Sequence, residues 1–342
     1  MSRVTVHDVA GAAGVSLATV DRVLNNRKGV RAETVDRVRD AMAQLNYVRD
    51  QTAANLARGR SYTFTFVVPS GGNSFMRQLE AEIERVKSEV ERERINISVV
   101  TVPPFEPESL AKMLDSLDLE AGAGIAVVAT ENWLIHEKIN DLKERGVHVV
   151  TLISDIPNSH RSHYVGIDNV AAGRVGASLL CRLVGERNGK IAVVAGSMTL
   201  RDHVERRLGF EQVARSEFPH LTLLPTVEGY DDAETVRIAL EALLRKNRDI
   251  VGVYSLGAGT RGVVAALAAV DNNQIIRSVA HELTEHSRKA LASGRLDAVL
   301  AQDSAREVRS AIRLLRALVD DEPIVESQER IPIEIYMRDN LP

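Results

Sequence analysis

The sequence predicts an N-terminal all-α helix-turn-helix headpiece, followed by an α/β domain of two lobes built on doubly wound parallel sheets. Two short helical patterns meet at a Gly-Val-Ser turn within the first 25 residues. From Tyr62 onward, β-rich apolar runs alternate with amphipathic helical stretches, which is the pattern of parallel sheets covered by helices. About 280 residues are too many for one such sheet, so two similar halves are expected.

Composition limits the class of protein. The chain has 342 residues, of which 44% are hydrophobic and 4% aromatic, so aliphatic side chains must fill its cores. No apolar run approaches the length needed to span a bilayer, and the first ten residues lack the apolar stretch of a signal peptide. The single cysteine, Cys181, lies in an apolar helical pattern and is expected to be a buried hydrophobe. These features predict a cytoplasmic protein.

The net charge of −4 conceals an asymmetry along the chain. Residues 1–60 hold 10 Lys and Arg against 6 Asp and Glu, whereas the remainder holds 33 against 41. A basic head on an acidic body suits a protein whose head alone meets nucleic-acid phosphates. A solvated charged surface is the usual alternative for such an excess.

Local signals define the first two helices of the headpiece. Thr5 and Asp8 are spaced like a capping box, so the first helix is expected to begin at Thr5 or Val6. Gly14 allows the backbone of the turn, and Ser16 is a favourable N-cap for the second helix. The inner positions of the two helices are expected to be Val6, Val9, Ala10, Ala13, Val20, Val23 and Leu24.

The outer face of the second helix carries chemistry suited to DNA. Its residues are Leu17, Ala18, Asp21 and Arg22. An arginine at this place can donate two hydrogen bonds to guanine in the major groove, and Leu17 and Ala18 can approach base edges closely. Ser16 and Thr19 can donate to phosphate, helped by the helix N-terminus. The alternative is an ordinary helical hairpin with a chance Gly-Val-Ser turn.

A third helix and a short helical segment complete the first 60 residues. The third helix is expected over Arg31–Leu45, with its inner face formed by Val35, Val38, Ala41, Met42 and Leu45. Residues 50–60 follow as an alanine-rich stretch that ends at Gly59. A helix of fewer than about 12 residues is marginal by itself, so this segment is expected to be helical only when docked.

The chain resembles the lactose-repressor (LacI/GalR) family of bacterial regulators. The residues that carry the resemblance are VHDVAGAAGVSLATVDRVLN (6–25), VDRVRDAMAQLNY (35–47) and AANLA (53–57). The resemblance implies that Leu17, Ala18 and Arg22 read bases in the major groove, and that Leu56 wedges into the minor groove and bends the DNA. It also implies a homodimer on a near-palindromic operator, with the two hinge segments paired at its centre.

The DNA-contacting residues expected in full are Thr5, Ser16, Leu17, Ala18, Thr19, Asp21, Arg22, Asn25, Ala53 and Leu56. Two positions depart from the family, which usually has Ser where Asp21 stands and where Arg31 precedes the third helix. These departures affect the expected base preference more than the fold. The domain organisation expected is a DNA-binding domain at 1–48, a hinge at 49–61, and a two-lobed sugar-binding and dimerisation domain at 62–342.

The body is expected to contain ten strands separated mostly by helices. The strands are Thr63–Val68, Ile95–Val102, Gly124–Ala129, Val147–Ile153, Lys190–Ala195, Leu221–Val227, Ile250–Ser255, Ile275–His281, Ala298–Ala301 and Ile331–Tyr336. The helices include Phe75–Glu93, Asn132–Arg145, Ala171–Gly185, Val204–Glu217, Ala233–Lys246, Gly262–Val270 and Arg306–Leu318.

Ligands of open α/β sheets bind beyond the carboxyl ends of the strands, so a cleft between the two halves is expected. The resemblance implies a body similar to periplasmic sugar-binding proteins, with crossovers near Ser159–Tyr164, Ala301–Ser304 and Ile324–Glu329. It implies a small-molecule effector in the cleft, with a monosaccharide or polyol favoured. The ligand-binding residues expected are Asn73, Phe75, Asp155, His203, Arg206, Ser255, Glu282 and Gln302. Asp168 is expected to cap a helix.

The segment Gly257–Gly262 supports an alternative function. It spells G-x-G-x-x-G between a strand and a helix, and Glu282 lies 20 residues beyond it, as in an NAD(P)-dependent oxidoreductase. The late position of the motif and the DNA-binding head favour a regulator, so we expect neither enzymatic activity nor a cofactor. No hydrolase motif occurs, and the nine histidines show no metal-ligand spacing. A transport receptor is disfavoured by the same head.

Overall fold

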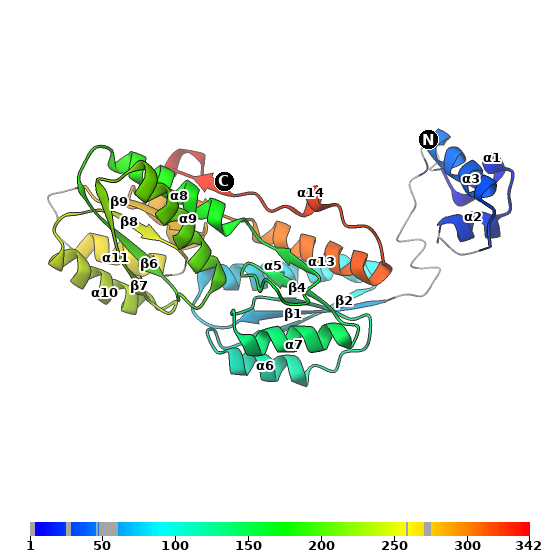
Figure 1. The fold of residues 1–342 in the computed structure, drawn as a ribbon, viewed down its shortest axis with the longest axis horizontal. Helices are drawn as coiled ribbons and strands as arrows, with labels where there is room; N and C mark the ends of the chain where they lie inside the picture. The colour runs from blue at the N-terminus through cyan, green and yellow to red at the C-terminus, as the bar shows by residue number, and fades with distance from the viewer. Residues whose placement is uncertain (1–3, 25–28, 46, 48–60, 258, 270–274) are drawn as a thin grey trace. The chain divides into compact units, whose positions relative to one another are not determined.

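The computed structural model describes residues 4–24, 29–45, 47, 61–257, 259–269 and 275–342. The chain divides into two compact units, Met1–Ser61 and Tyr62–Pro342 (Figure 1). The expected hinge at 49–61, apart from Ser61, lies outside the described residues. Within the described part of the chain, no helix is both long and apolar enough to cross a bilayer.

The described part of the first unit contains three helices: α1 (Val6–Ala13), α2 (Leu17–Leu24) and α3 (Ala32–Gln44). The predicted capping box is confirmed, because Thr5 and Asp8 each bond the other's backbone N–H. Gly14 closes α1 in the left-handed region at φ +62°, and the Ser16 hydroxyl accepts a hydrogen bond from the backbone of Thr19 at 3.2 Å. Arg31 precedes α3 without a side-chain capping bond.

The core of the first unit contains Val9, Ala10, Ala13, Val20, Val38 and Ala41, with Val23 and Leu24 partly buried against it. The predicted inner faces are therefore confirmed, except that Val35 of α3 is only half-buried and is not part of this core. With its inner face buried, α2 leaves its opposite face exposed to solvent, as the sequence predicts.

The N-terminal lobe of the second unit has a parallel sheet in the order β2-β1-β3-β4-β5. Its strands are β1 (Tyr62–Pro69), β2 (Ile95–Val102), β3 (Gly124–Val127), β4 (His148–Leu152) and β5 (His163–Val165). Side chains alternate across the sheet: Phe64 and Phe66 pack toward α5 (Ser74–Val90) and α13 (Ser304–Asp320). Val67 packs on the other face, which α6 (Pro107–Ser116) and α7 (Trp133–Glu144) cover (Figure 1). A 3₁₀ turn, η1 (Glu91–Glu93), follows α5.

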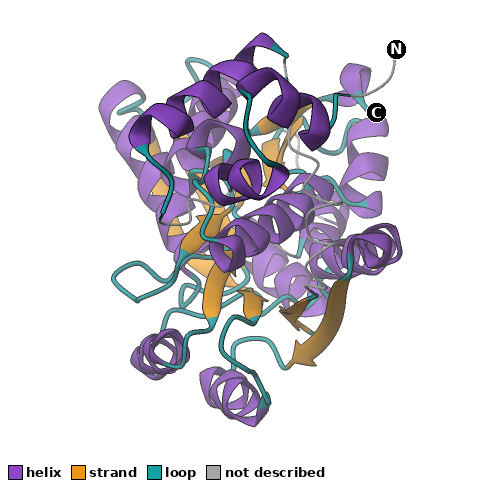
Figure 2. Cartoon of the chain, turned by 90° about the vertical axis from the view of Figure 1, so that its right-hand side faces the viewer, coloured by secondary structure: helices purple, strands orange, loops and turns teal. Residues whose placement is uncertain are grey.

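The C-terminal lobe has a six-stranded sheet in the order β11-β10-β9-β8-β6-β7, in which only β11 is antiparallel to its neighbour. Its strands are β6 (Gly189–Ala195), β7 (Leu221–Glu228), β8 (Ile250–Ser255), β9 (Arg277–His281), β10 (Ala298–Ala301) and β11 (Glu334–Tyr336). Its helices are α8 (Asn169–Val184), α9 (Arg201–Glu217), α10 (Ala233–Lys246), α11 (Thr260–Ala269), α12 (Glu285–Ala292) and the 3₁₀ turn η2 (Arg338–Asn340). Helices cover both faces of the strands (Figure 2).

Three segments connect the lobes. The sequence predicts the first at Ser159–Tyr164, but His163 and Tyr164 belong to β5, which pairs with β4. The chain therefore crosses to the other lobe after β5. The sequence does not predict this strand, because it has only three residues and two of them are polar or partly polar. The crossover between β10 and α13 is confirmed at Ala301–Ser304. The third segment contains the short helix α14 (Glu326–Glu329) and leads to β11.

The expected strands are all present; β2, β8 and β10 have the predicted ends, and the other seven differ by one to three residues at an end. β3 ends at Val127 although Val128 and Ala129 remain buried, and β9 begins at Arg277. β11 begins at Glu334 although the apolar run starts at Ile331, which is buried in the N-terminal lobe. A run of apolar residues in the sequence shows which residues are buried. Burial extends past the last residue that pairs with a neighbouring strand, so these predicted strand ends differ from the observed ones. The helices α6 and α12 are additions to those that the sequence predicts.

Candidate functional site

A pocket lies between the two lobes of the second unit, at the carboxyl ends of β1, β6, β7, β8 and β9. It encloses about 70 Å³. The N-terminal lobe supplies residues 72–76 and Ile153, and the C-terminal lobe supplies the remaining, mostly polar wall. This is the edge at which open α/β sheets bind ligands.

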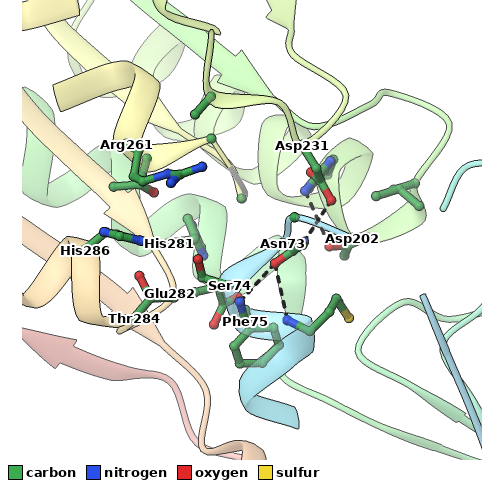
Figure 3. Close-up of a pocket in the computed structure, with 18 of the residues that line it drawn as sticks. Asn73, Ser74, Phe75, Asp202, Asp231, Arg261, His281, Glu282, Thr284 and His286 are labelled. Carbon is green, nitrogen blue, oxygen red and sulfur yellow. Dashed lines mark hydrogen bonds and ion pairs between the residues drawn. The ribbon is translucent and has the colours of Figure 1, made fainter. Parts of the chain in front are cut away.

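Asn73 joins the two walls of the pocket (Figure 3). Its side-chain oxygen caps α5 by accepting hydrogen bonds from the backbones of Phe75 at 3.0 Å and Met76 at 3.3 Å. Its amide nitrogen donates to Oδ2 of Asp231 in the C-terminal lobe at 2.8 Å. The ring of Phe75 lines the same pocket and offers an apolar surface.

Arg206 is the buried cation of the site, with 1% of its surface exposed. Nε donates to Oδ1 of Asn169 at 2.8 Å, Nη1 to the Leu256 carbonyl at 2.7 Å, and Nη2 to Oε1 of Glu282 at 3.2 Å. Glycine allows this placement, because a Cβ at Gly173 of α8 would lie 2.0 Å from the Arg206 carbonyl oxygen. The close approach of α8 and α9 therefore fixes the guanidinium behind the pocket.

Glu282 stands just after β9 with a left-handed backbone at φ +69°. Its Oε1 accepts hydrogen bonds from Arg206 and, at 2.9 Å, from Nε2 of Gln302. Its Oε2 is buried without a hydrogen-bond partner among the described residues. Burial raises the pKa of Glu282, and the neighbouring Arg206 opposes that increase.

The structure brings Asn73, Phe75, His203, Arg206 and Glu282 together in the lining of this pocket. Gln302 contacts the site through Glu282. Ser255 is fully buried and its hydroxyl donates to the Gly257 carbonyl, so it is not part of the lining.

Asp155, which the sequence also suggests as a ligand-binding residue, is not among the residues that line this pocket. The Thr151 hydroxyl and the Ile156 backbone each donate to its Oδ1 at 2.8 Å, and Arg161 pairs with both of its oxygens. Asp155 therefore holds the loop after β4. Asp168 caps α8, as expected.

Two acidic pocket residues were missed by the sequence analysis. Asp202 lies in the first turn of α9 and is 5% exposed, and Asp231 follows β7 with φ +60°. Burial raises the pKa of Asp231. Asp202 immediately precedes His203 and could have been included on that ground. Asp231 follows a strand in a loop that gives no motif.

A second chamber adjoins the first and encloses about 50 Å³. We call the first the polar chamber and the second the apolar chamber, since Pro69, Val102, Pro104 and Leu110 line the latter. The residues that line both chambers are Asn73, Met76, Ile153, Leu200, Asp202 and Asp231.

The glycines of the Gly257–Gly262 segment contact protein atoms. A Cβ at Gly257 would lie 2.2 Å from Nε2 of His203, and one at Gly262 would lie 2.2 Å from the Ala233 carbonyl oxygen. Tight packing between the strand end, α9 and α10 thus accounts for the outer glycines of the motif.

In the first unit, α2 presents its predicted face to solvent: Ala18, Asp21 and Arg22 are exposed, and Leu17 is 41% exposed. The Thr5 hydroxyl donates to Asp8, and the hydroxyls of Ser16 and Thr19 are 2.9 Å apart. Asn25, Ala53 and Leu56 lie outside the described residues.

Comparisons with known proteins agree with this architecture. Residues 5–50 match bacterial regulatory proteins of the lacI family, and residues 64–323 match the periplasmic binding protein domain. The HTH-type transcriptional regulator pepR1 of Lactobacillus delbrueckii subsp. lactis is 25% identical over 343 residues, which cover 98% of this chain and 97% of that protein. The HTH-type transcriptional regulator GalS of Salmonella typhimurium is 26% identical over 278 residues, covering 80% and 76%.

Among solved structures, GanP, a glucose-galactose binding protein from Geobacillus stearothermophilus, superimposes with a TM-score of 0.72 at 18% identity. The alignment covers 83% of this chain and 99% of that protein, and at this identity it shows the fold alone. None of these three proteins is an oxidoreductase, so the dinucleotide-binding interpretation of Gly257–Gly262 gains no support. The chain belongs to the lacI family of bacterial regulatory proteins, and is a helix-turn-helix transcriptional regulator whose second domain has the periplasmic-binding-protein fold.

Proposed function

We propose that this regulator is a cytoplasmic homodimer that represses transcription from a near-palindromic operator, and that a small sugar or polyol in the interlobe cleft controls its affinity for DNA. The observation that carries the effector part is the set of buried polar atoms in the pocket that have no hydrogen-bond partner in the described part of the chain, among them Oε2 of Glu282. A ligand rich in hydroxyls supplies the hydrogen bonds that such atoms lack. Control of DNA affinity requires that this ligand bind the two states of the regulator unequally.

Substitution of Arg22 tests the proposed contact between α2 and bases in the major groove. Arg22→Ala is expected to weaken binding to a duplex selected by the wild-type protein about 10- to 100-fold, because a bidentate contact to guanine is lost. Binding to random DNA should persist and remain salt-dependent. Fluorescence anisotropy with both duplexes measures the effect, and Arg39→Ala, on an exposed part of α3, is the matched control. Equal affinity of Arg22→Ala and wild type for the selected duplex would contradict the assignment.

The hinge role of Leu56 is proposed from the family resemblance. Leu56→Ala should reduce bending of the selected duplex, because a smaller side chain separates base pairs less effectively. Bending is measured by energy transfer between dyes at the two ends of the duplex. An unchanged bend angle would count against a wedge at this position.

The effector proposal is tested by thermal shift against a panel of monosaccharides and polyols. A compound that binds the folded protein raises the melting temperature in proportion to the logarithm of its concentration above Kd. That compound should also change the affinity for the selected duplex. A compound that raises the melting temperature and leaves DNA affinity unchanged is not the effector.

A further inference from the structure

Three carboxylate oxygens in the cleft are buried without hydrogen-bond partners among the described residues: Oδ1 of Asp202, Oδ1 of Asp231 and Oε2 of Glu282. All three belong to the C-terminal lobe and line the polar chamber. A buried ionised oxygen that lacks a donor is costly, so the occupied site must supply donors. The pocket therefore selects against ligands that present an anionic group to this wall.

The buried positive charge of the cleft, Arg206, already has hydrogen-bond partners within the protein. Arg206 pairs with Glu282 and also donates hydrogen bonds to Asn169 and the Leu256 carbonyl. Arg261 lines the polar chamber but is exposed to solvent. Asp202 and Asp231 therefore form an acidic pair to which no arginine or lysine among the described residues donates a hydrogen bond.

His203 and His281 do not donate a hydrogen bond to this acidic pair. Nδ1 of His203 faces the Ser197 backbone, 2.9 Å from its carbonyl oxygen and 3.4 Å from its nitrogen, so this atom is not available to Asp202 or Asp231. Nε2 is 3.7 Å from Oδ2 of Asp202, beyond hydrogen-bond distance. Burial, followed by Arg206, lowers the pKa of His281 well below its ordinary value, so that ring is neutral.

The acidic pair occupies the junction of the two chambers. Asp202 and Asp231 line both, and Asn73 holds Oδ2 of Asp231 while Oδ1 stays without a partner in the described structure. An ammonium group carries three donors and one positive charge, which matches two adjacent carboxylates better than one hydroxyl does. Resting on the effector role proposed above, we propose that the ligand is an amino sugar or amino polyol whose protonated amine contacts Asp202 and Asp231.

Calorimetric titration of the full-length protein with matched sets tests this inference. The sets are D-glucosamine, D-glucose and D-glucuronate, and the corresponding galactose and mannose compounds. In the set that fits the pocket, the amine should bind about tenfold more tightly than the neutral sugar, because a charge-assisted bond replaces a neutral one. The acid should show no binding.

Two isosteric variants locate the amine. Asp202→Asn and Asp231→Asn should each remove the tenfold preference for the amine over the neutral sugar. The melting temperature without ligand shows whether each variant is folded, and either folded variant suffices for the test. Asp115→Asn, an exposed carboxylate paired with Lys138 in the other lobe, is the matched control and should keep the preference.

The outcomes separate this inference from the effector proposal. An acid or neutral sugar that binds as tightly as its amine overturns the amine assignment and leaves a sugar effector in place. A preference for the amine that survives in folded Asp202→Asn or Asp231→Asn overturns the placement at these residues. A protein that binds no member of any set overturns both the inference and the effector proposal.

Discussion

Arg206 and Glu282 form a buried ion pair whose two members depend on each other. Both are inside the lobe, and each also bonds a neutral partner, Asn169 or Gln302. Removing one member of such a pair leaves the other charge without compensation, which costs about 3–5 kcal/mol. The pair therefore ties the position of the pocket wall to the stability of the C-terminal lobe.

Arg206→Ala is accordingly expected to lower the free energy of unfolding by about 3–5 kcal/mol, measured by urea denaturation. Arg85→Ala is the matched control, because Arg85 pairs with Glu82 and Glu89 on the surface and such pairs contribute about 0–1 kcal/mol. A loss no larger than that of the control would contradict the assignment of Arg206 as a structural charge.

Glu307 on α13 predicts a pH dependence. Its side chain is 0% exposed and neither oxygen has a partner within the described structure. Burial, followed by repulsion from Glu282, raises its pKa well above the ordinary value of 4.5. The folded chain then keeps a proton that the unfolded chain releases, so this group makes stability decrease as pH rises above about 4.5.

Glu307→Gln should therefore be more stable than wild type at pH 8, and the difference should shrink as pH decreases toward 4.5. Thermal unfolding across this range measures the difference. Glu137→Gln, on an exposed position of α7, controls for loss of a negative charge and should show no such trend. A difference that is constant with pH would exclude Glu307 as its source.

At the scale of elements, the turn between α1 and α2 depends on one glycine. Gly14 has φ +62°, whereas Gly11 lies inside α1, and a Cβ at either position would meet nothing within 4 Å. The two sites therefore differ in backbone conformation and not in available space. Ala is disfavoured in the left-handed region and favoured inside a helix.

Gly14→Ala should destabilise the first unit by about 1 kcal/mol, and Gly11→Ala should stabilise it by about 0.5–1 kcal/mol. Hydrogen exchange of the α1 amides in the full chain measures both changes. Changes of the same sign in the two variants would contradict the geometry of the turn.

At the scale of the whole second unit, three contacts bridge the lobes at the cleft. Asn73 donates to Asp231, the rings of Phe105 and Tyr230 meet edge to face with centroids 6.1 Å apart, and Arg201 pairs with Glu131 at 3.4 Å. Phe105, Tyr230 and Asp231 all have positive φ, so both loops are held in conformations that non-glycine residues rarely adopt. The described structure is thus a closed form stabilised by side chains at the cleft.

Tyr230→Ala should shift the protein without ligand toward an open form. Dyes on Glu108→Cys and Arg245→Cys, one in each lobe, report the change as reduced energy transfer. Cys181 does not interfere, because burial raises its pKa to about 12 and keeps it unreactive. Ile238→Ala removes an exposed apolar side chain from α10 and is the control. Unchanged energy transfer in Tyr230→Ala would show that this contact does not hold the lobes closed.

The sequence alone determined the features that depend on local chemistry. The capping box of Thr5 and Asp8, the turn at Gly14, most of the inner face of each headpiece helix and the order of every strand except β5 follow from propensity and periodicity, which act over a few residues. Pocket residues that follow strands or match the family pattern, such as Asn73 and Glu282, were also accessible from the sequence.

Which side chains come into contact depends on how distant parts of the chain pack. Asp155 binds its own loop, Ser255 is buried at the end of β8, and Asp231 reaches the cleft from a loop without a motif. The partnership of Arg206 with Glu282 spans 76 residues and exists because Gly173 lets two helices touch. Periodicity assigns a residue to one face of its own element. Long-range packing decides what lies opposite that face, and it therefore decides which acidic residues line the polar chamber.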